Sequence, residues 1–279
     1  MLRSAFNLRS NFQAFSELLM LLTRFRVLTF EMARREITDR YTGQFFGIFW
    51  TFVHPLILIL VYVFLFNFVF VSKIGGTQAL PLDMTSYILA GLIPWLAFSD
   101  ALGKASTVII NNANLVKQVI FPIEVLPVKS VLATLFTQLV FLALFIVYTL
   151  ISNHTLWITI LLLPVLLVLQ TLGMIGLTYI LAAIGTYIRD TKDFIQVFIT
   201  LGLWFVPILY LPEAIPKAVR PILVLNPFAH MVWCYQDILY FGRFEHPASW
   251  IIFPLLCLVV FLCGYRLFRK LKTMFGNVL

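Results

Sequence analysis

Charged side chains that could bind an anionic ligand lie close together in the segment RREITDR, which runs from Arg34 to Arg40. The guanidinium groups of Arg34, Arg35 and Arg40 are planar and can bind phosphate oxygens in pairs. A lipid pyrophosphate or an acidic partner protein would suit such a set. Arginines beside a membrane also act simply as topology anchors, so both interpretations stay open at this point.

Residue pairs that could support acid–base catalysis are few. Asp190 lies near Asp193, and His230 lies seven positions before Asp237, but neither pair matches a catalytic pattern. The chain has no GxxxxGK[ST] phosphate loop of the kind that binds ATP. Its four histidines are scattered and show no paired spacing typical of a metal site. We therefore predict no catalytic residue, metal site or cofactor on this chain.

Aromatic side chains form a second kind of candidate site. Ten of the residues from Phe45 to Val71 are aromatic, and at about 100° per residue many of them share one side of a helix. Aromatic rings can stack on sugar rings, so such a helix could offer a smooth surface to a moving glycan. The same rings could instead face lipid, with an interfacial tryptophan. The glycan-contact candidates are Phe45, Phe49, Trp50, Phe52, Phe66 and Phe70.

The composition indicates the class of protein that must position these groups. Of 279 residues, 61% are hydrophobic and 11% are charged, whereas a soluble domain has about 25% charged residues. We therefore expect an all-α integral membrane protein. A helix needs about 20 apolar residues to cross a bilayer. We assign six spans: Phe45–Val71, Thr85–Leu102, Ser130–Ile151, Trp157–Tyr187, Phe194–Leu211 and Ser249–Phe268. Pro94 and Asp100 interrupt the second, and the fifth is short and could be re-entrant.

The basic residues predict the orientation. Lys and Arg accumulate on the cytoplasmic side of membrane proteins, so the net charge of +8 need not indicate nucleic acid. With six spans, sixteen Lys and Arg residues fall on the side of the N-terminus and four on the other. Both termini should therefore be cytoplasmic in an inner membrane. The divisions are a cytoplasmic segment 1–44, a transmembrane domain 45–268 and a tail 269–279.

Two segments on the cytoplasmic side should be helical. Apolar residues recur at three- and four-residue intervals before the first span, at Leu18, Leu21, Leu22, Phe25, Leu28 and Met32. This spacing predicts an amphipathic interface helix, with Glu31–Arg35 and Glu36–Arg40 as ion pairs. Gly43 then allows a turn into the first span. After the second span, a short helix is expected at 113–120 and must end before Pro122.

The segment 212–247 is the longest on the opposite side. Its prolines separate two apolar blocks, 215–225 and 229–241, which predict short amphipathic or re-entrant helices. Such a segment could gate the outer end of a pathway or merely pack against the bundle. The gate candidates are Pro212, Pro216, Pro221, Asn226 and Pro227.

Several motifs occur together in a recognisable order. They are Arg35-Glu36-Ile37 with Arg40-Tyr41, Gly91-Leu92-Ile93-Pro94-Trp95, Asn114-Leu115-Val116-Lys117 with Phe121-Pro122, Arg189-Asp190, Pro207-Ile208-Leu209-Tyr210 and Leu225-Asn226-Pro227. With them the chain resembles the permease subunits of type-2 polysaccharide-exporting ABC transporters, which serve O-antigen, teichoic acid and capsule. The family usually has a basic residue after Phe-Pro, where this chain has Ile123-Glu124.

The resemblance implies a homodimer that works with two cytoplasmic ATPase subunits, which would bind ATP and Mg. It implies a lipid-linked polysaccharide as cargo in a channel between the protomers. It also implies that the interface helix and the 111–120 segment contact the ATPases. The contact candidates are Glu31, Arg35, Asn114, Leu115, Lys117 and Phe121.

Two alternatives remain. An ABC exporter of the same fold could carry drugs or small lipids, since the fold does not determine the cargo. A membrane-embedded glycolipid enzyme would need a polar catalytic cluster, for which only the two pairs above come close.

Overall fold

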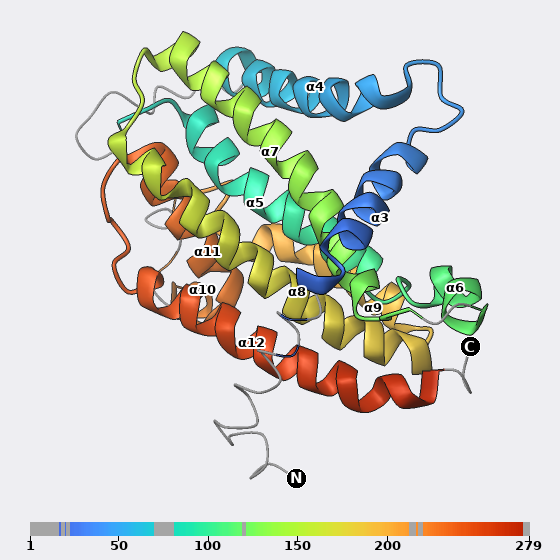
Figure 1. Cartoon of the computed structure of the whole chain (residues 1–279). Coiled ribbons are helices and arrows are strands. Elements are labelled where there is room, and N and C mark those ends of the chain that lie inside the picture. Colours follow the sequence, from blue (N-terminus) through green and yellow to red (C-terminus); the bar gives the residue numbers. More distant parts are fainter. Residues whose placement is uncertain are drawn as a thin grey trace.

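The computed structural model describes residues 17, 20, 23–69, 81–118, 121–211, 216 and 220–275. These residues form helices and connecting turns only (Figure 1). The elements are α3 (Arg26–Asp39), η1 (Gly47–Phe49), α4 (Trp50–Phe64), η2 (Leu65–Val69), α5 (Met84–Ala105), η3 (Ile110–Asn112), α6 (Ala113–Gln118), α7 (Val125–Asn153), η4 (Ile158–Leu162), α8 (Leu163–Tyr187), α9 (Thr191–Gly202), η5 (Leu203–Phe205), α10 (Arg220–Leu225), α11 (Pro227–Gln236), η7 (Asp237–Phe241), α12 (Ser249–Leu271) and η8 (Lys272–Met274).

Among the described residues, five helical stretches are long and apolar enough to cross a membrane. They are Gly47–Val69, Met84–Ala105, Val125–Asn153, Ile158–Tyr187 and Ser249–Met274, and they correspond to five of the six predicted spans. The predicted span Phe194–Leu211 is different, because α9 has only 12 residues and is followed by the single turn η5. Helix α9 therefore does not meet the length of a complete span on its own.

Helix α5 is the centre of the bundle. Every residue from Met84 to Trp95 is buried, and α4, α7, α8, α9 and α11 all contact it. Polar contacts join it to its neighbours at three levels, because polar groups buried in an apolar interior need hydrogen-bond partners. Asp83, just before α5, accepts from Tyr148 and Asn153 at the end of α7. The Pro94 carbonyl accepts from Gln170 of α8 at 3.0 Å.

The third level lies at the far end of α5, where Asp100 accepts a hydrogen bond from Thr134 of α7 at 2.6 Å. This is one end of the bundle, where α3, α6 and the ends of α8 and α12 also gather. The Tyr187 hydroxyl, for example, donates to the Leu271 carbonyl at 3.1 Å. We call it the arginine end. The opposite end, which contains Asp83 and the 154–157 and 242–248 turns, we call the hairpin end.

Helices α8 and α12 pack backbone to backbone. The contact is possible because Gly176 and Gly264 have no side chains. A Cβ on Gly264 would lie 2.1 Å from the Gly176 carbonyl oxygen, and one on Gly176 would lie 2.6 Å from the Phe261 backbone. Small residues at a helix crossing allow this close approach within membranes.

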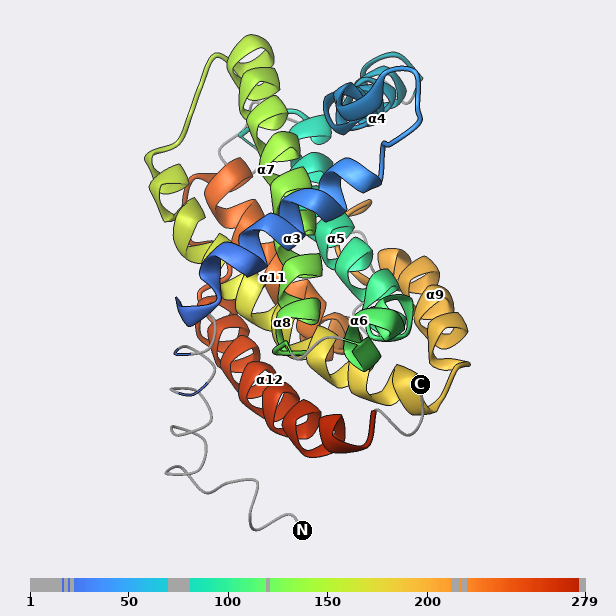
Figure 2. The ribbon, with the colours of Figure 1, turned by 45° about the vertical axis from the view of Figure 1, so that its right-hand side comes forward.

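Helix α4 stands at the edge of the bundle, beside α7 (Figures 1 and 2). Only Thr51, Pro55 and Ile59, spaced four residues apart, are buried in it. In the most apolar window of this span, 11% of the residues are buried, compared with 78% for α5. Most of the α4 surface is therefore left for lipid or for another chain.

Helix α3 crosses α7 (Figure 2) and only partly matches the predicted amphipathic helix. Its buried residues are Thr29 and Ala33, whereas the predicted stripe residue Leu28 is 37% exposed. The small side chains of Thr29 and Ala33 let α3 approach α7 closely. The face of α3 that is buried is therefore not its most apolar face. Leu18, Leu21 and Leu22 lie outside the described residues. The predicted turn at Gly43 is confirmed by its φ of +81°.

We predict that Gly264→Ala destabilises the protein and that Gly103→Ala, the same change on α5, does not. Alanine favours a helix over glycine by about 1 kcal/mol, but overpacking costs about 1–3 kcal/mol. At Gly103 the new Cβ would meet only the Ile199 side chain, at 3.8 Å. The thermal midpoint of the purified protein in detergent measures both effects. Equal midpoints for the two variants would contradict the backbone contact.

Candidate functional site

One carboxylate organises the arginine end. The Asp100 Oδ2 atom accepts from the Thr134 hydroxyl at 2.6 Å, from Arg40 at 3.4 Å and from Lys104 through a very short contact. The Asp100–Lys104 pairing is the one expected for residues four apart on a helix. Two cations thus share a single carboxylate oxygen.

The ion pairs predicted within α3 are replaced by pairs with other partners. Glu36 contacts Lys129 at 3.5 Å and accepts from the Ser130 hydroxyl at 3.1 Å, both on α7. Arg35 pairs with Asp39 at 3.4 Å instead of Glu31. The Glu36–Arg40 prediction was wrong because α3 packs across α7, which brings Lys129 to Glu36 and Asp100 to Arg40. The Glu31–Arg35 prediction was wrong because Arg35 pairs with the acidic residue one turn later in the same helix.

The three arginines predicted as one anion site lie apart. Arg34 and Arg35 are exposed on α3, and the Arg35 side chain is 83% accessible. Arg40 instead turns toward α5 and lines a cavity. The tertiary packing thus separates one inward-facing arginine from two outward-facing ones.

This cavity lies between α4, α5 and α7 and has a volume of about 440 Å³; we call it the α4 cavity. Its wall near the arginine end carries Arg40, Asp100 and Thr134. Leu58, Ile93 and Phe141 line it closer to the hairpin end. The space is therefore polar at one end and apolar at the other.

A second hollow, the α3 cleft, lies between α3, η3, α6 and α7, with a volume of about 780 Å³. Of the predicted ATPase-contact residues, Arg35, Leu115 and Phe121 line it, whereas Glu31 lies on another side of α3. Asn114 and Lys117 are exposed on α6. Glu36, Asp39, Asn111 and Asn112 also line the cleft and belong to the two segments that the resemblance implied as ATPase contacts. Sequence reasoning did not place Lys104 and Lys129 there, because α5 and α7 reach the cleft only through tertiary packing.

The aromatic residues around α4 are mostly exposed, as a contact surface requires. Phe45 is 96%, Phe49 68% and Phe52 50% exposed. Phe66 is partly buried and stacks on Tyr62, with ring centroids 6.3 Å apart. Trp50 is half-buried in the α4 cavity, and Phe70 lies outside the described residues. The predicted set therefore does not form one uniform face.

A further exposed aromatic surface, which sequence reasoning missed, lies on α9 and η5. Helix α9 buries only a narrow stripe against the bundle, at Thr191, Ile195 and Gly202. The four-residue spacing of two of its phenylalanines was the available signal. The exposed aromatic residues are Phe194, Phe198, Trp204 and Phe205.

Helices α10 and α11 form a hairpin that reaches into the bundle. Asn226 caps α11, since its side chain accepts from the Phe228 backbone N–H at 3.0 Å. Phe228 packs on Trp95 and Phe98 in the middle of α5, whereas the Tyr240 hydroxyl bonds the Leu82 carbonyl before α5. From Phe228 to Tyr240 the chain thus runs from the middle of the bundle to the end that contains Asp83 and the 242–248 turn. Of the gate candidates, Pro216, Pro221 and Pro227 are exposed and Pro212 lies outside the described residues.

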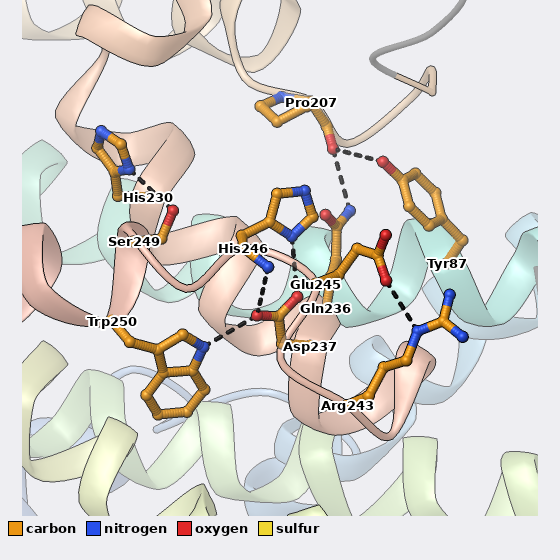
Figure 3. A network of polar contacts seen from close by, with 10 residues as sticks. All are labelled: Tyr87, Pro207, His230, Gln236, Asp237, Arg243, Glu245, His246, Ser249 and Trp250. Atoms are coloured by element: carbon orange, nitrogen blue, oxygen red, sulfur yellow. Dashed lines mark hydrogen bonds and ion pairs between the residues drawn. The ribbon is translucent and has the colours of Figure 1, made fainter. Parts of the chain in front are cut away.

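Asp237 holds the turn between η7 and α12 in place (Figure 3). Its buried carboxylate accepts from the His246 backbone N–H at 3.1 Å, the His246 ring at 2.8 Å and Trp250 Nε1 at 2.9 Å. The His246 ring also stacks on Trp233, with centroids 5.1 Å apart. All three donors belong to the turn and the start of α12, so the Asp237 carboxylate is used to hold this part of the chain in place.

The candidate catalytic pair of His230 with Asp237 is not formed. His230 lies 2.9 Å from both the Ser249 hydroxyl and the Val224 carbonyl. Burial lowers the pKa of His230, which favours the neutral ring. Because a carbonyl only accepts, Nε2–H must donate to Val224 and Nδ1 must accept from Ser249. Both ring nitrogens therefore have structural roles.

We predict that Asp237→Ala loosens the 242–250 turn, because it leaves three partly buried donors without an acceptor. An unsatisfied buried group costs about 1–3 kcal/mol. Glu245→Ala is the matched control in the same turn, since the Arg243–Glu245 pair is exposed and such pairs contribute about 0–1 kcal/mol. Hydrogen exchange of the turn amides should rise clearly only in Asp237→Ala. Unchanged exchange there would contradict the structural role.

Known proteins resemble this chain over most of its length. The ABC-2 type transporter family matches residues 27–240. The O-antigen export system permease protein RfbA of Myxococcus xanthus is 30% identical, covering 92% of this chain and 96% of that protein. Two proteins of the same name from Klebsiella pneumoniae are 24% and 23% identical, each covering 89% of this chain and 93% of its own length. The chain therefore belongs to the ABC-2 type transporter family, which confirms the resemblance predicted from its motifs.

Proposed function

We propose that the chain is the membrane-spanning subunit of an ATP-driven exporter for a lipid-linked polysaccharide. The observation that carries the proposal is the exposed aromatic surface of α4, on a membrane-length helix that packs weakly against its own bundle. Aromatic rings can stack on sugar rings, and relatives of this chain are named O-antigen export permeases. Together these two facts support a polysaccharide as the cargo.

The transport path would run between two copies of the chain. A single protomer leaves the aromatic surfaces of α4 and of α9 with η5 without a partner among the described residues. Pairing two protomers over these surfaces would line a channel with rings that tolerate many sugars. In this arrangement α9, η5 and residues 206–211 complete a sixth crossing, so both termini lie in the cytoplasm of an inner-membrane protein.

The arginine end would face the cytoplasm and receive the ATPase subunits. The α3 cleft and the exposed residues Asn114, Leu115 and Lys117 on α6 offer a hollow and a rim of mixed charge there. The chain has no phosphate loop of its own, so ATP and Mg would be bound by the partner. Arg34 and Arg35 point outward on α3 and are available for that contact or for lipid phosphates.

The hairpin of α10 and α11 would form the gate on the outer side. Its position favours this role, since α11 lies against α5 and its N-terminal Phe228 also contacts Phe198 of α9, with ring centroids 5.6 Å apart. A movement of α9 would therefore shift the hairpin through this contact.

In the same arrangement, α3 would lie as an interface helix at the cytoplasmic surface of the membrane.

An exporter of drugs or small lipids is the second candidate, because it would share the fold. The exposed aromatic surface favours the polysaccharide. A glycolipid-modifying enzyme has less support, because the His230 and Asp237 side chains are each engaged elsewhere.

We expect the tagged chain, purified from its native membrane in mild detergent, to bring a soluble subunit that carries a phosphate-binding loop. The complex should hydrolyse ATP, and a deletion strain should lose a surface glycan while its drug resistance is unchanged. If crosslinking in the membrane found no ATPase partner, the exporter hypothesis would be abandoned. A partner without any change in surface glycan would favour the second candidate.

We further predict that the double variant Phe49→Leu, Phe52→Leu exports several-fold less glycan at normal protein level. Both side chains are at least half exposed, so leucine removes the ring without opening the core. Phe136→Leu on α7, also an exposed aromatic at 39%, is the matched control. Normal glycan export by the double variant would exclude stacking on α4 as part of the path.

A further inference from the structure

The α4 cavity contains a buried hydrogen-bond acceptor without a partner. Gln138 of α7 lines the cavity and is 1% exposed. Its Oε1 atom has no hydrogen-bond partner among the described residues. Such an orphan acceptor is unusual in a folded interior and calls for an explanation.

The neighbouring contacts determine which atom of Gln138 is left over. The Pro94 carbonyl can only accept, so it binds the Gln170 Nε2 group at 3.0 Å. The Gln170 Oε1 atom then faces Gln138 and Tyr235 and accepts from both, with 2.8 Å to Gln138 Nε2. Gln138 Nε2 is thus engaged with Gln170, and Oε1 is the end that needs a donor. A ligand in the cavity could supply one after a small turn of the Gln138 side chain, because Gln138 lines the cavity but its Oε1 atom is enclosed.

The arginine end of the same cavity carries a cation, Arg40, whose hydrogen-bond donors are largely unused. Asp100 Oδ2 already accepts from Lys104 and from Thr134 at 2.6 Å. Arg40 makes one long contact of 3.4 Å with it, although a guanidinium has five N–H donors. Arg40 therefore has donors to offer to an anion, and phosphate is the anion that a planar guanidinium binds best.

The two polar positions are separated by one helical turn. Thr134, which contacts the same carboxylate oxygen as Arg40, precedes Gln138 by four residues, about 6 Å along α7. A phosphate and a hydroxyl of one sugar phosphate or glycerol phosphate can span that separation. Beyond them the walls are apolar, at Leu58, Ile93 and Phe141. Because α4, α5 and α7 are all membrane-length helices, an amphiphile fits this sequence of surfaces better than a water-soluble ligand.

We propose that the α4 cavity binds the head of a lipid in which a phosphate lies next to a hydroxyl group. The phosphate contacts Arg40, the hydroxyl donates to Gln138 Oε1, and the hydrocarbon chain lies along Leu58, Ile93 and Phe141. The site is inside one protomer, behind α4, and so is separate from the channel proposed between protomers. Both a lipid-linked sugar and a phospholipid with a hydroxyl-bearing head, such as phosphatidylglycerol, have this head chemistry.

Two synthetic lipids of equal charge test the hydroxyl contact. Dioleoyl phosphatidylglycerol has hydroxyls beside its phosphate, and dioleoyl phosphatidylmethanol has none. Native mass spectrometry of the purified chain should show phosphatidylglycerol binding about fivefold tighter, as one hydrogen bond would give. Gln138→Met should remove this preference and leave phosphatidylmethanol binding unchanged. A merely structural effect of the substitution would weaken both lipids alike, which would overturn the proposal.

Two further variants test the phosphate contact and the location. Arg40→Gln should weaken both lipids to a similar extent, because both carry the phosphate. Ala97→Phe fills the cavity from α5 without changing its polar groups and should abolish binding of both. Ala143→Phe, the same change on an exposed position of α7, should bind like the wild type. Ala97→Leu, a smaller change, replaces Ala97→Phe if that variant does not fold. Binding that survives cavity filling would overturn the proposal.

Competition identifies the source of the lipid. A polyprenyl pyrophosphate bearing one sugar should displace phosphatidylglycerol if the cargo occupies the site. If it does not, while the Gln138 and Arg40 effects hold, the occupant is a bulk phospholipid. These binding measurements involve neither ATP nor transport, so their failure would leave the proposed export function untouched.

Discussion

The rest of the structure depends on the need to satisfy polar groups inside an apolar helix bundle. Hydrogen bonds at Asp83, Pro94 and Asp100 join α5 to α7 and α8 at three levels. An unpaired polar group at any of these levels would be costly in hydrocarbon. The contacts therefore fix the rotation and the depth of α5, against which α11 also packs.

The helix surfaces that do not pack into this core are the ones available for function. Helix α4 buries three small or aliphatic residues, and α9 buries a similarly narrow stripe. Their remaining surfaces are rich in exposed aromatic side chains. In a soluble protein such surfaces would indicate aggregation, but in a membrane permease they are suited to lipid, a second protomer or cargo.

The α3 cleft and the α4 cavity share a wall. Lys104 lines the cleft and contacts Asp100, which lines the cavity together with Arg40. A partner bound in the cleft and a ligand bound in the cavity would therefore act on neighbouring charges. On the other side of the bundle, Phe228 of α11 packs between α5 and α9. Each proposed site is thus in direct contact with α5.

The sequence by itself determined the protein class, five of the helices long enough to cross a membrane, the turn at Gly43 and the family. These follow from local hydropathy, residue spacing and ordered motifs, which need no knowledge of neighbouring helices. Only the tertiary structure decided the partners of Glu36 and Arg40 and the orphan atom of Gln138. Those depend on residues distant in the chain: α3 meets α7, and Gln138 meets Gln170 and Tyr235. Helical periodicity shows which residues share a face, but not which helix that face will contact.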